Sequence, residues 1–363
     1  MPSTFTKLAD LPLEIESCTL QGLSEDIGFE RLTTVVCLRG GGEEGIGEDI
    51  TTLNEDQLAF QRAGAPDLTG SWTLAELGAY IDGLDLFPTE PLLRACRVWR
   101  RWAFHSAALD LALRQAGRAL HEVLGLQPRP VEFVFSARLG HPPSVEGMRK
   151  LLGSYPGLRL KLNAFAWDDR LVGEIAELHA VETVDFKGYA PDLGLGCPAD
   201  PVLYRQVAEA MPHAWLEDPH LATAEADAAL APYRDRITWD APIGSIADIE
   251  ALAFPPRMLN IKPSRFGSLE DVCGVYDFCA EHGIGVYGGG MFELGPGRGQ
   301  AQYLASIFHP ETPNDITPTG YYDTVADDGG NAGIDGRPSA LPDGLPTSPL
   351  APAPAVTGFR WAE

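Results

Sequence analysis

Three neighbouring apolar runs decide the fold of this sequence: VETVDFKG (181–188), HAWLEDP (213–219) and ITWDAPI (237–243). Each run has the length and composition of a buried β-strand. Near the end of each run stands an acidic residue, namely Asp185, Glu217 and Asp240. The segments between the runs have the periodicity of amphipathic helices, and strands that alternate with helices form a parallel sheet. The three acids are therefore expected at one edge of such a sheet.

The same alternation extends from about residue 130 to residue 318. Five further strand-like runs belong to it: VEFVFSA (131–137), LRLKLNA (158–164), MLNIKPS (258–264), IGVYGGGMFEL (284–294) and NDITP (314–318). Eight strand–helix units in a row predict a parallel α/β barrel, whose functional side chains lie at the carboxyl ends of the strands. A doubly wound open sheet is the alternative, but no GxGxxG or GxxxxGK[ST] motif follows the early strands.

The regions before and after this pattern differ from it. TTVVCLRGGGEEGIGED (33–49) reads as strands around a glycine turn, and WAFHSAALDLALRQAGRALHEVLG (102–125) reads as helix. We therefore predict an α+β domain over residues 1–129 and a barrel over residues 130–323. Residues 324–363 are rich in Gly, Pro, Ala and Asp and predict an extended segment, whose GFRW (358–361) is expected to pair back onto the first domain.

Composition restricts the classes of partner. The chain has 363 residues, 45% of them hydrophobic, with 27 Lys and Arg against 51 Asp and Glu, a net charge of -24. This charge repels phosphate backbones and anionic membranes, so neither nucleic acid nor membrane is an expected partner. The six cysteines contain no CxxC pair and are expected to be reduced. No secretory signal pattern or run of about 18 apolar residues occurs, which predicts a cytoplasmic protein.

The three acids are candidate metal ligands. Around a barrel mouth Asp185, Glu217 and Asp240 become neighbours, and like charges that close raise one another's pKa values unless a cation is present. Oxygen ligands favour a hard ion, Mg²⁺ first and Mn²⁺ second. A simpler interpretation is that each acid caps the following helix, but three acids in register favour the metal site.

Two lysines lie in flanking runs, Lys161 in RLKLN and Lys262 in NIKPS. Lysine is rare inside apolar strands unless it has a partner or a chemical role. A partly desolvated ammonium group near a cation has a lowered pKa and can act as a general base, whereas structural salt bridges to the three acids are the alternative. Across a barrel mouth the two lysines would face opposite sides of one substrate.

Taken together, the ordered set resembles the enolase superfamily. The set comprises a V-x-L-x-G…G-I-G-E-D segment, the helix AALDLALRQAGRAL, Lys on strand two, acids on strands three to five, and Lys on strand six with FGS after it. It is most similar to the branch of muconate lactonizing enzyme, dipeptide epimerases and o-succinylbenzoate synthase. The resemblance implies an α+β capping domain over a modified (β/α)7β barrel. It also implies Mg²⁺ bound by Asp185, Glu217 and Asp240, with acid–base roles for Lys161 and Lys262.

Three motifs depart from that family pattern. The K-x-K of strand two is Arg159-Leu160-Lys161 here, and a shifted alignment would place Asn163 at the position of the base. The D-x-N of strand three is Asp185-Phe186-Lys187, so Lys187 enters as a cation for a substrate carboxylate, as a competing base or as an ion-pair partner of an acid. The D-E pair of strand five is Asp240-Ala241. Arg159 and Asn163 are therefore candidate substrate-binding residues.

Residues near the last strands complete the candidates. Strand seven has no His, which disfavours the mandelate racemase branch, but it is followed by Glu293 among glycines. Glu293 is a candidate to position substrate or bind a lysine, with helix capping as the alternative, and Arg265 is a candidate partner of an anionic group. Arg298 and residues 314–315 also lie near strand ends, where surface roles are favoured.

The predicted function is Mg²⁺-dependent removal of a proton α to a carboxylate of a small organic acid. The enediolate formed would lead to epimerisation or racemisation, cycloisomerisation or β-elimination. The expected partners are this small-molecule carboxylate and further copies of the chain in a homo-oligomer. Two other classes compete: a catalytically altered relative that only binds metal or ligand, and a metal-dependent aldolase or hydrolase on an ordinary barrel.

Overall fold

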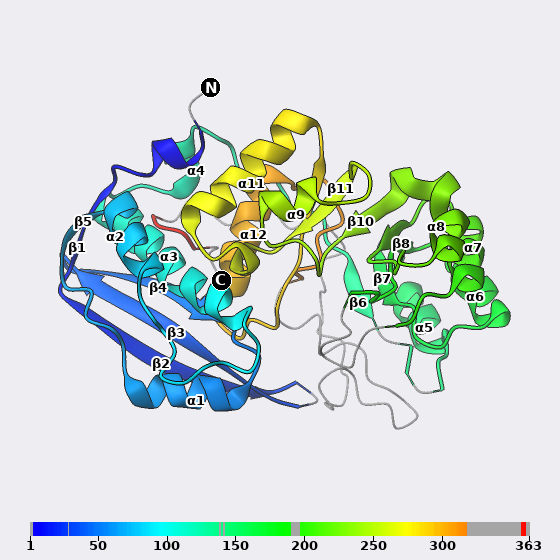
Figure 1. Ribbon diagram of the computed structural model, residues 1–363, viewed down its shortest axis with the longest axis horizontal. Helices are drawn as coiled ribbons and strands as arrows, with labels where there is room; N and C mark the ends of the chain where they lie inside the picture. The colour runs from blue at the N-terminus through cyan, green and yellow to red at the C-terminus, as the bar shows by residue number, and fades with distance from the viewer. Residues whose placement is uncertain are drawn as a thin grey trace.

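The computed structural model describes residues 3–27, 29–137, 139–140, 142–189, 197–317 and 357–360. The chain forms two parts that lie side by side (Figure 1). The N-terminal part contains antiparallel sheets with helices, and the second part contains a curled parallel sheet with helices on its outer side. The predicted mixed α/β architecture is confirmed at this level.

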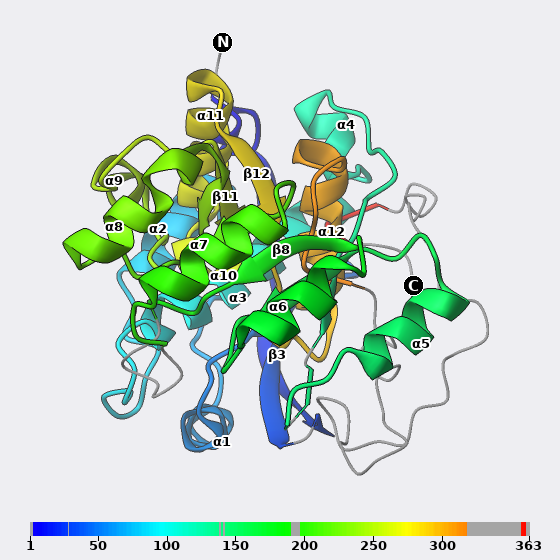
Figure 2. The same ribbon diagram turned by 90° about the vertical axis from the view of Figure 1, so that its right-hand side faces the viewer.

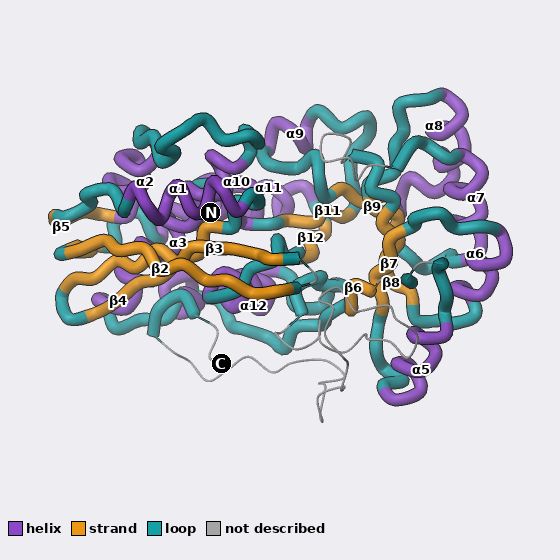
Figure 3. Tube along the Cα trace, turned by 90° about the horizontal axis from the view of Figure 1, so that it is seen from below, coloured by secondary structure: helices purple, strands orange, loops and turns teal. Residues whose placement is uncertain are grey.

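Seven parallel strands build the second part. They are β6 (Phe135–Ala137), β7 (Leu160–Asn163), β8 (Val181–Asp185), β9 (Trp215–Glu217), β10 (Ile237–Trp239), β11 (Met258–Ile261) and β12 (Gly285–Gly288). They pair in the order β12-β11-β10-β9-β8-β7-β6, and Figure 3 shows them curled around one axis. The order follows the sequence without reversal, so the sheet is not the doubly wound alternative.

Among its described residues, 314–317, the eighth predicted strand forms only isolated bridges. Asn314 pairs with Phe133 beside β6, and Asp315 pairs with Gly289 beside β12, both in parallel. Val134 N donates to Asn314 O at 2.9 Å and Asp315 N donates to Gly288 O at 2.7 Å. Pro313 precedes these residues and has no N–H group, so it cannot extend the ladder. The described strands therefore form a seven-stranded curled sheet instead of the continuous ring that eight predicted strands would give.

The helices between the strands begin and end at the expected signals. The longer ones are α5 (Glu146–Ser154), α6 (Asp169–Ala176), α7 (Pro201–Ala210), α11 (Leu269–His282) and α12 (Pro296–Phe308). Shorter ones are α8 (Ala224–Leu230), α9 (Ile246–Glu250) and α10 (Pro263–Phe266). Asp168 caps α6 by accepting from Leu171 N, and α11 ends at Gly283 with φ 65°, as its sequence predicts. Figure 2 shows α6 and α7 side by side on the outer face of the sheet.

The N-terminal part has two sheets, four α-helices and the short 3-10 helix η1 (Phe5–Lys7) among its described residues. Strands β2 (Ser17–Asp26), β3 (Glu30–Gly40) and β4 (Glu43–Asp49) form one antiparallel sheet, and β1 (Pro12–Ile15) pairs with β5 (Gly70–Thr73). The helices are α1 (Asn54–Ala63), α2 (Leu74–Asp82), α3 (Cys96–Gln115) and α4 (Leu120–Leu124). Strand β4 packs directly on α3, since a Cβ atom at Gly47 would lie 2.1 Å from Ala103 O. The predicted α+β character of this region is confirmed.

Residues 357–360 lie against the N-terminal part. Gly358 forms a parallel bridge with Ala119, and the buried Phe359 packs edge-on to Trp102. Buried Asp110 accepts from Phe359 N at 2.8 Å and pairs with Arg360 at 2.7 Å. Trp361, the last residue of the predicted pairing segment, lies outside the described residues. Within the part of the chain that the structure describes, no helix has both the length and the apolarity needed to cross a membrane.

Candidate active site

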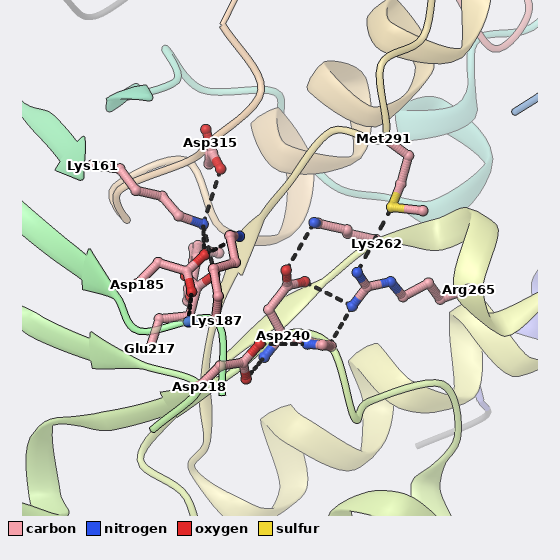
Figure 4. Close-up of polar contacts among 12 residues, drawn as sticks. Lys161, Asp185, Lys187, Glu217, Asp218, Asp240, Lys262, Arg265, Met291 and Asp315 are labelled. Atoms are coloured by element: carbon pink, nitrogen blue, oxygen red, sulfur yellow. Dashed lines mark hydrogen bonds and ion pairs between the residues drawn. The ribbon is translucent and has the colours of Figure 1, made fainter. Parts of the chain in front are cut away.

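The carboxyl ends of β7, β8 and β9 bring polar side chains together inside the curled sheet (Figure 4). Register places Asn163 beside Asp185 and Asp185 beside Glu217, so consecutive strands present their last residues to one point. Lys161, Asp185 and Glu217 are each at most 2% exposed. Charged groups this deeply buried require partners, and each of them has at least one.

An acidic cluster of Asp185, Glu217 and Asp218 occupies this point. Each of the three offers one carboxylate oxygen, and these oxygens all lie within 4.8 Å of one another. Asp240, the third ligand predicted from the sequence, does not belong to this cluster. The third member of the cluster is Asp218, whose φ of 48° lies in the left-handed region that residues other than glycine seldom adopt. Asp240 lies close enough for its charge to raise the pKa values of Glu217 and Asp218.

Asp218 also ties two strand ends together. Its Oδ1 accepts from Asp240 N at 2.8 Å and its Oδ2 accepts from Ala241 N at 2.9 Å. These two hydrogen bonds fix the position of the chain after β9 relative to the chain after β10. Sequence reasoning missed Asp218 because regular strand alternation puts the residue after Glu217 on the opposite face of the sheet. The signal that could have found it is the Glu217-Asp218 pair directly before Pro219.

Burial and crowding raise the pKa values of two of the three carboxyl groups, whereas, against the effect of burial, Lys187 and Lys161 lower that of Asp185. Burial, together with the neighbouring acids, raises the pKa of Glu217 to about 8 and that of Asp218 to about 7. A divalent cation relieves such crowding, and an all-oxygen donor set suits Mg²⁺. The three residues therefore fit a hard metal ion.

Two lysines contact the cluster. Lys161 Nζ lies 2.7 Å from Glu217 Oε1 and 3.0 Å from Asp315 Oδ2, and Lys187 Nζ donates to Asp185 Oδ2. Burial opposes the charged form of Lys161, but the carboxylates of Asp315, Glu217 and Asp185 outweigh it and raise the pKa of Lys161 well above its usual value. Both lysines are therefore ammonium donors in this arrangement.

A second group surrounds Asp240. Lys262 Nζ donates to Asp240 Oδ2 at 2.9 Å, and Arg265 Nη1 donates to Asp240 Oδ1 at 2.8 Å. Burial opposes ionisation of Asp240, but these two cations outweigh it and lower its pKa. Burial lowers the pKa of Lys262 against the opposing effect of Asp240. The structure thus brings Arg265 and Lys262 together on a fully buried carboxylate.

Lys161 and Lys262 face each other across the site. Lys161 is on β7 and Lys262 follows β11, with β8, β9 and β10 between them in the sheet. Figure 4 shows Lys161 extending from the left toward Asp185 and Glu217, and Lys262 extending from the right toward Asp240. Tyr287 of β12, which the sequence did not single out, donates its hydroxyl to Glu217 Oε2, and the site also includes Asp315.

The structure places the other candidates differently. Arg159 is exposed and pairs with Glu182, away from the cluster, because it precedes β7 and lies at the opposite end of that strand from Asn163. Glu293 is buried and accepts from Met291 N at 2.9 and 3.0 Å, a contact within its own loop that caps no helix. Arg298 is also buried and donates to Thr317 O at 2.9 Å. These contacts of Arg159, Glu293 and Arg298 do not reach the acidic cluster.

Comparison with protein families identifies the chain. The family model described as the C-terminal domain of DUF8230, a domain of unknown function, matches residues 127–323, and the model of its N-terminal domain matches residues 6–123. The chain belongs to the DUF8230 family.

Comparison with single proteins relates this DUF8230 chain to enzymes. It is 25% identical over 346 residues to the N-succinylamino acid racemase of Thermus thermophilus, covering 87% of this chain and 85% of the racemase. It is 41% identical over 66 residues to the o-succinylbenzoate synthase of Bacillus subtilis, a match that spans 18% of each chain.

Solved structures relate the DUF8230 chain to the same superfamily. The dipeptide epimerase of Methylococcus capsulatus, solved with Mg and the dipeptide L-Arg-D-Lys, has a TM-score of 0.63 at 19% identity and covers 85% of this chain and 91% of its own. At this identity the likeness concerns the fold. The predicted resemblance to the enolase superfamily is confirmed.

Proposed function

We propose that this chain is a Mg²⁺-dependent isomerase or lyase that removes the proton α to the carboxylate of a small organic acid. The observation that carries the proposal is the buried cluster of Asp185, Glu217 and Asp218 between two opposed lysines. The superfamily fold and the enzymes among the relatives support the reaction class. The proposal includes the modified (β/α)7β barrel, with residues 314–315 between β12 and β6 as its closing segment.

Asp185, Glu217 and Asp218 would hold the metal ion, with Mn²⁺ as a second fit to the same oxygen ligands. When bound, it would supply the positive charge that lowers the free energy of an enediolate. Lys187, whose side chain is 30% exposed, would turn from Asp185 to the carboxylate of the substrate. A fixed ammonium group there would stabilise negative charge as it develops.

Lys161 and Lys262 would carry the proton transfers on the two faces of the substrate. If the neutral amine of one lysine takes the α-proton and the ammonium group of the other returns a proton to the opposite face, the configuration of the α-carbon is inverted. This outcome is epimerisation or racemisation. If one lysine takes the proton while the other stays charged, a leaving group can depart by β-elimination, or a ring can open or close. Lys262, whose pKa is lowered, is the better base of the two in this arrangement.

The test is deuterium incorporation from D₂O with Mg²⁺, read by mass across libraries of N-acyl amino acids, dipeptides, acid sugars and cyclic acids. We expect a mass increase of one unit in at least one acid. Lys161→Ala and Lys262→Ala should each abolish exchange of the enantiomer whose α-proton faces the replaced lysine. The exposed Arg159→Ala variant is the control and should exchange at the rate of the unchanged protein. Exchange that survives both lysine substitutions contradicts the proposal.

One observation favours a second candidate, a relative that binds metal or ligand without turnover. Lys161 and Lys187 already contact Glu217 and Asp185, so these ammonium groups compete with a metal ion for the same oxygens. This candidate predicts that the protein binds acids from the library, detected by thermal shift, but exchanges no α-proton in any of them. The same screen therefore separates the two candidates.

A further inference from the structure

The loop that joins β12 to α12, residues 289–295, lies between the site and the N-terminal part. On the side of the site, Met291 Sδ lies 3.8 Å from Arg265 Nη2, and Arg265 in turn binds Asp240 (Figure 4). The loop begins with Gly289 and Gly290, which impose little backbone preference of their own. Contacts from elsewhere in the molecule must therefore determine its shape.

Glu48 of β4 supplies the acceptors for this loop. Its side chain is buried, and its two oxygens accept four hydrogen bonds from three backbone N–H groups. Oε1 accepts from Leu294 at 2.7 Å and from Gly295 at 3.1 Å, and Oε2 accepts from Gly295 at 3.0 Å and from Gly297 at 2.9 Å. These groups lie at the start of α12, where a negative charge also interacts favourably with the helix dipole.

Arg31 of β3 supplies the donors. It is 2% exposed, and its guanidinium donates to Phe292 O at 3.3 Å and to Met291 O at 3.5 Å. The same group donates to Ile50 O and Thr51 O, both at 2.8 Å, so it joins the loop to the end of β4. Phe292 has a φ of 61°, a left-handed conformation that a phenylalanine keeps only when its surroundings hold it.

We propose that Glu48 and Arg31 are positioning residues for the Lys262 side of the site. Between them they bind the N–H and C=O groups of residues 291–297, and this places Met291 against Arg265, which shares Asp240 with Lys262. Lys161 instead pairs with Glu217 and Asp315 on the other side of the site, so we expect the effect mainly at Lys262. The inference rests on the proposed function, because it assigns the two lysines to opposite faces of a substrate.

The first arm of the test needs no substrate. In Glu48→Gln the amide group places an N–H where a backbone N–H now donates, so the loop loses at least one hydrogen bond. Hydrogen–deuterium exchange of the peptide covering residues 289–297 should become about tenfold faster. Glu44→Gln is the matched control, since Glu44 is on the same strand and pairs at the surface with Arg39 at 2.5 Å. Its exchange in this peptide should stay unchanged.

The second arm measures the two faces separately, using both enantiomers of an acid that the protein exchanges. In Glu48→Gln, α-proton exchange of the enantiomer whose α-proton faces Lys262 should slow about tenfold or more. The exchange rate of the other enantiomer should stay within about twofold of its rate in the unchanged protein. The enantiomer whose exchange Lys262→Ala abolishes identifies that face. Equal slowing of both enantiomers, or an unchanged amide exchange, overturns the inference.

Failure of the proposed function gives a different result. If the unchanged protein exchanges no α-proton at all, the proposed reaction has failed, and the amide exchange of residues 289–297 alone decides whether Glu48 holds the loop. The same two measurements, amide exchange and enantiomer exchange, are repeated with Arg31→Gln, which removes the donors to the loop. Arg39→Gln is the control for this variant. Unchanged amide exchange in both Glu48→Gln and Arg31→Gln would rule out the positioning role.

Discussion

At the scale of single residues, the site is a set of buried carboxylates, and three of them, Asp185, Glu217 and Asp240, contact a cation. Lys161 and Lys187 contact Glu217 and Asp185, and Lys262 with Arg265 contacts Asp240. Asp218 differs, because its oxygens accept only backbone N–H groups among the hydrogen bonds of the structure. It is therefore the acid whose charge has the fewest competing partners for a metal ion.

Substitution of the third ligand tests this difference. We expect Asp218→Asn to weaken Mg²⁺ binding about 100-fold or more, because removal even of a group behind a metal ligand costs about 10–100-fold. Asp240→Asn should change the affinity by less than about fivefold, since that side chain holds Lys262 and Arg265. Isothermal titration with Mg²⁺ measures both. If Asp218→Asn still binds Mg²⁺ strongly and Asp240→Asn does not, the third metal ligand is Asp240 instead.

The raised pKa values of the cluster predict how Mg²⁺ binding depends on pH. The pKa of Glu217 is raised from 4.5 to about 8 and that of Asp218 from 3.8 to about 7. Below these values the groups hold protons that a metal ion must displace, so affinity should rise as pH increases from about 6 to about 8 and level off above. Titrations at several pH values measure this, and an affinity that is flat over the range would contradict it.

At the scale of elements, buried polar contacts determine where the loops lie. Arg100 of α3 has a fully buried side chain, donates to Asp49 at 2.8 Å, and has its guanidinium 4.1 Å from the ring centre of Phe60 and 3.7 Å from that of Phe87. It also donates to Asp56 O at 3.1 Å. These contacts attach both ends of the segment between β4 and α1 to α3.

Removal of this cation should destabilise the protein strongly. Arg100→Met leaves the buried Asp49 carboxylate with fewer partners, and breaking a buried ion pair from one side costs about 3–5 kcal/mol of unfolding free energy. Arg39→Met, which removes an exposed ion pair with Glu44, should cost only about 0–1 kcal/mol. Urea unfolding followed by circular dichroism compares the two. Equal effects would show that the buried contacts contribute no more than the surface pair.

At the scale of the whole molecule, the two parts share one set of contacts around the site. Helix α3 packs against β4 and α10, and β4 in turn reaches α12 through Glu48. Phe359 from the end of the chain lies between Trp102 of α3 and Tyr303 of α12, with ring centres 6.4 and 6.1 Å away. The N-terminal part is therefore joined to the loop beside Arg265 as well as to the outer helices.

Sequence patterns predicted the parallel strands, the helices with their caps and the acids at the strand ends. These features depend on local periodicity, glycine and capping residues, so Asp185, Glu217, Lys161 and Lys262 could be placed at one edge of the sheet. Asp218 was not singled out, because regular strand alternation places the residue after Glu217 on the opposite face of the sheet.

Only the tertiary structure decided which of these groups meet. The backbone of Asp218 adopts a left-handed conformation that turns its carboxylate inward, while Asp240 is held by Lys262 and Arg265. Glu48 binds backbone groups about 250 residues away, a contact that no local pattern encodes. Local patterns thus define the elements and the polar residues at their ends, whereas contacts between distant residues assemble the cluster, because burial and charge pairing act on the folded chain.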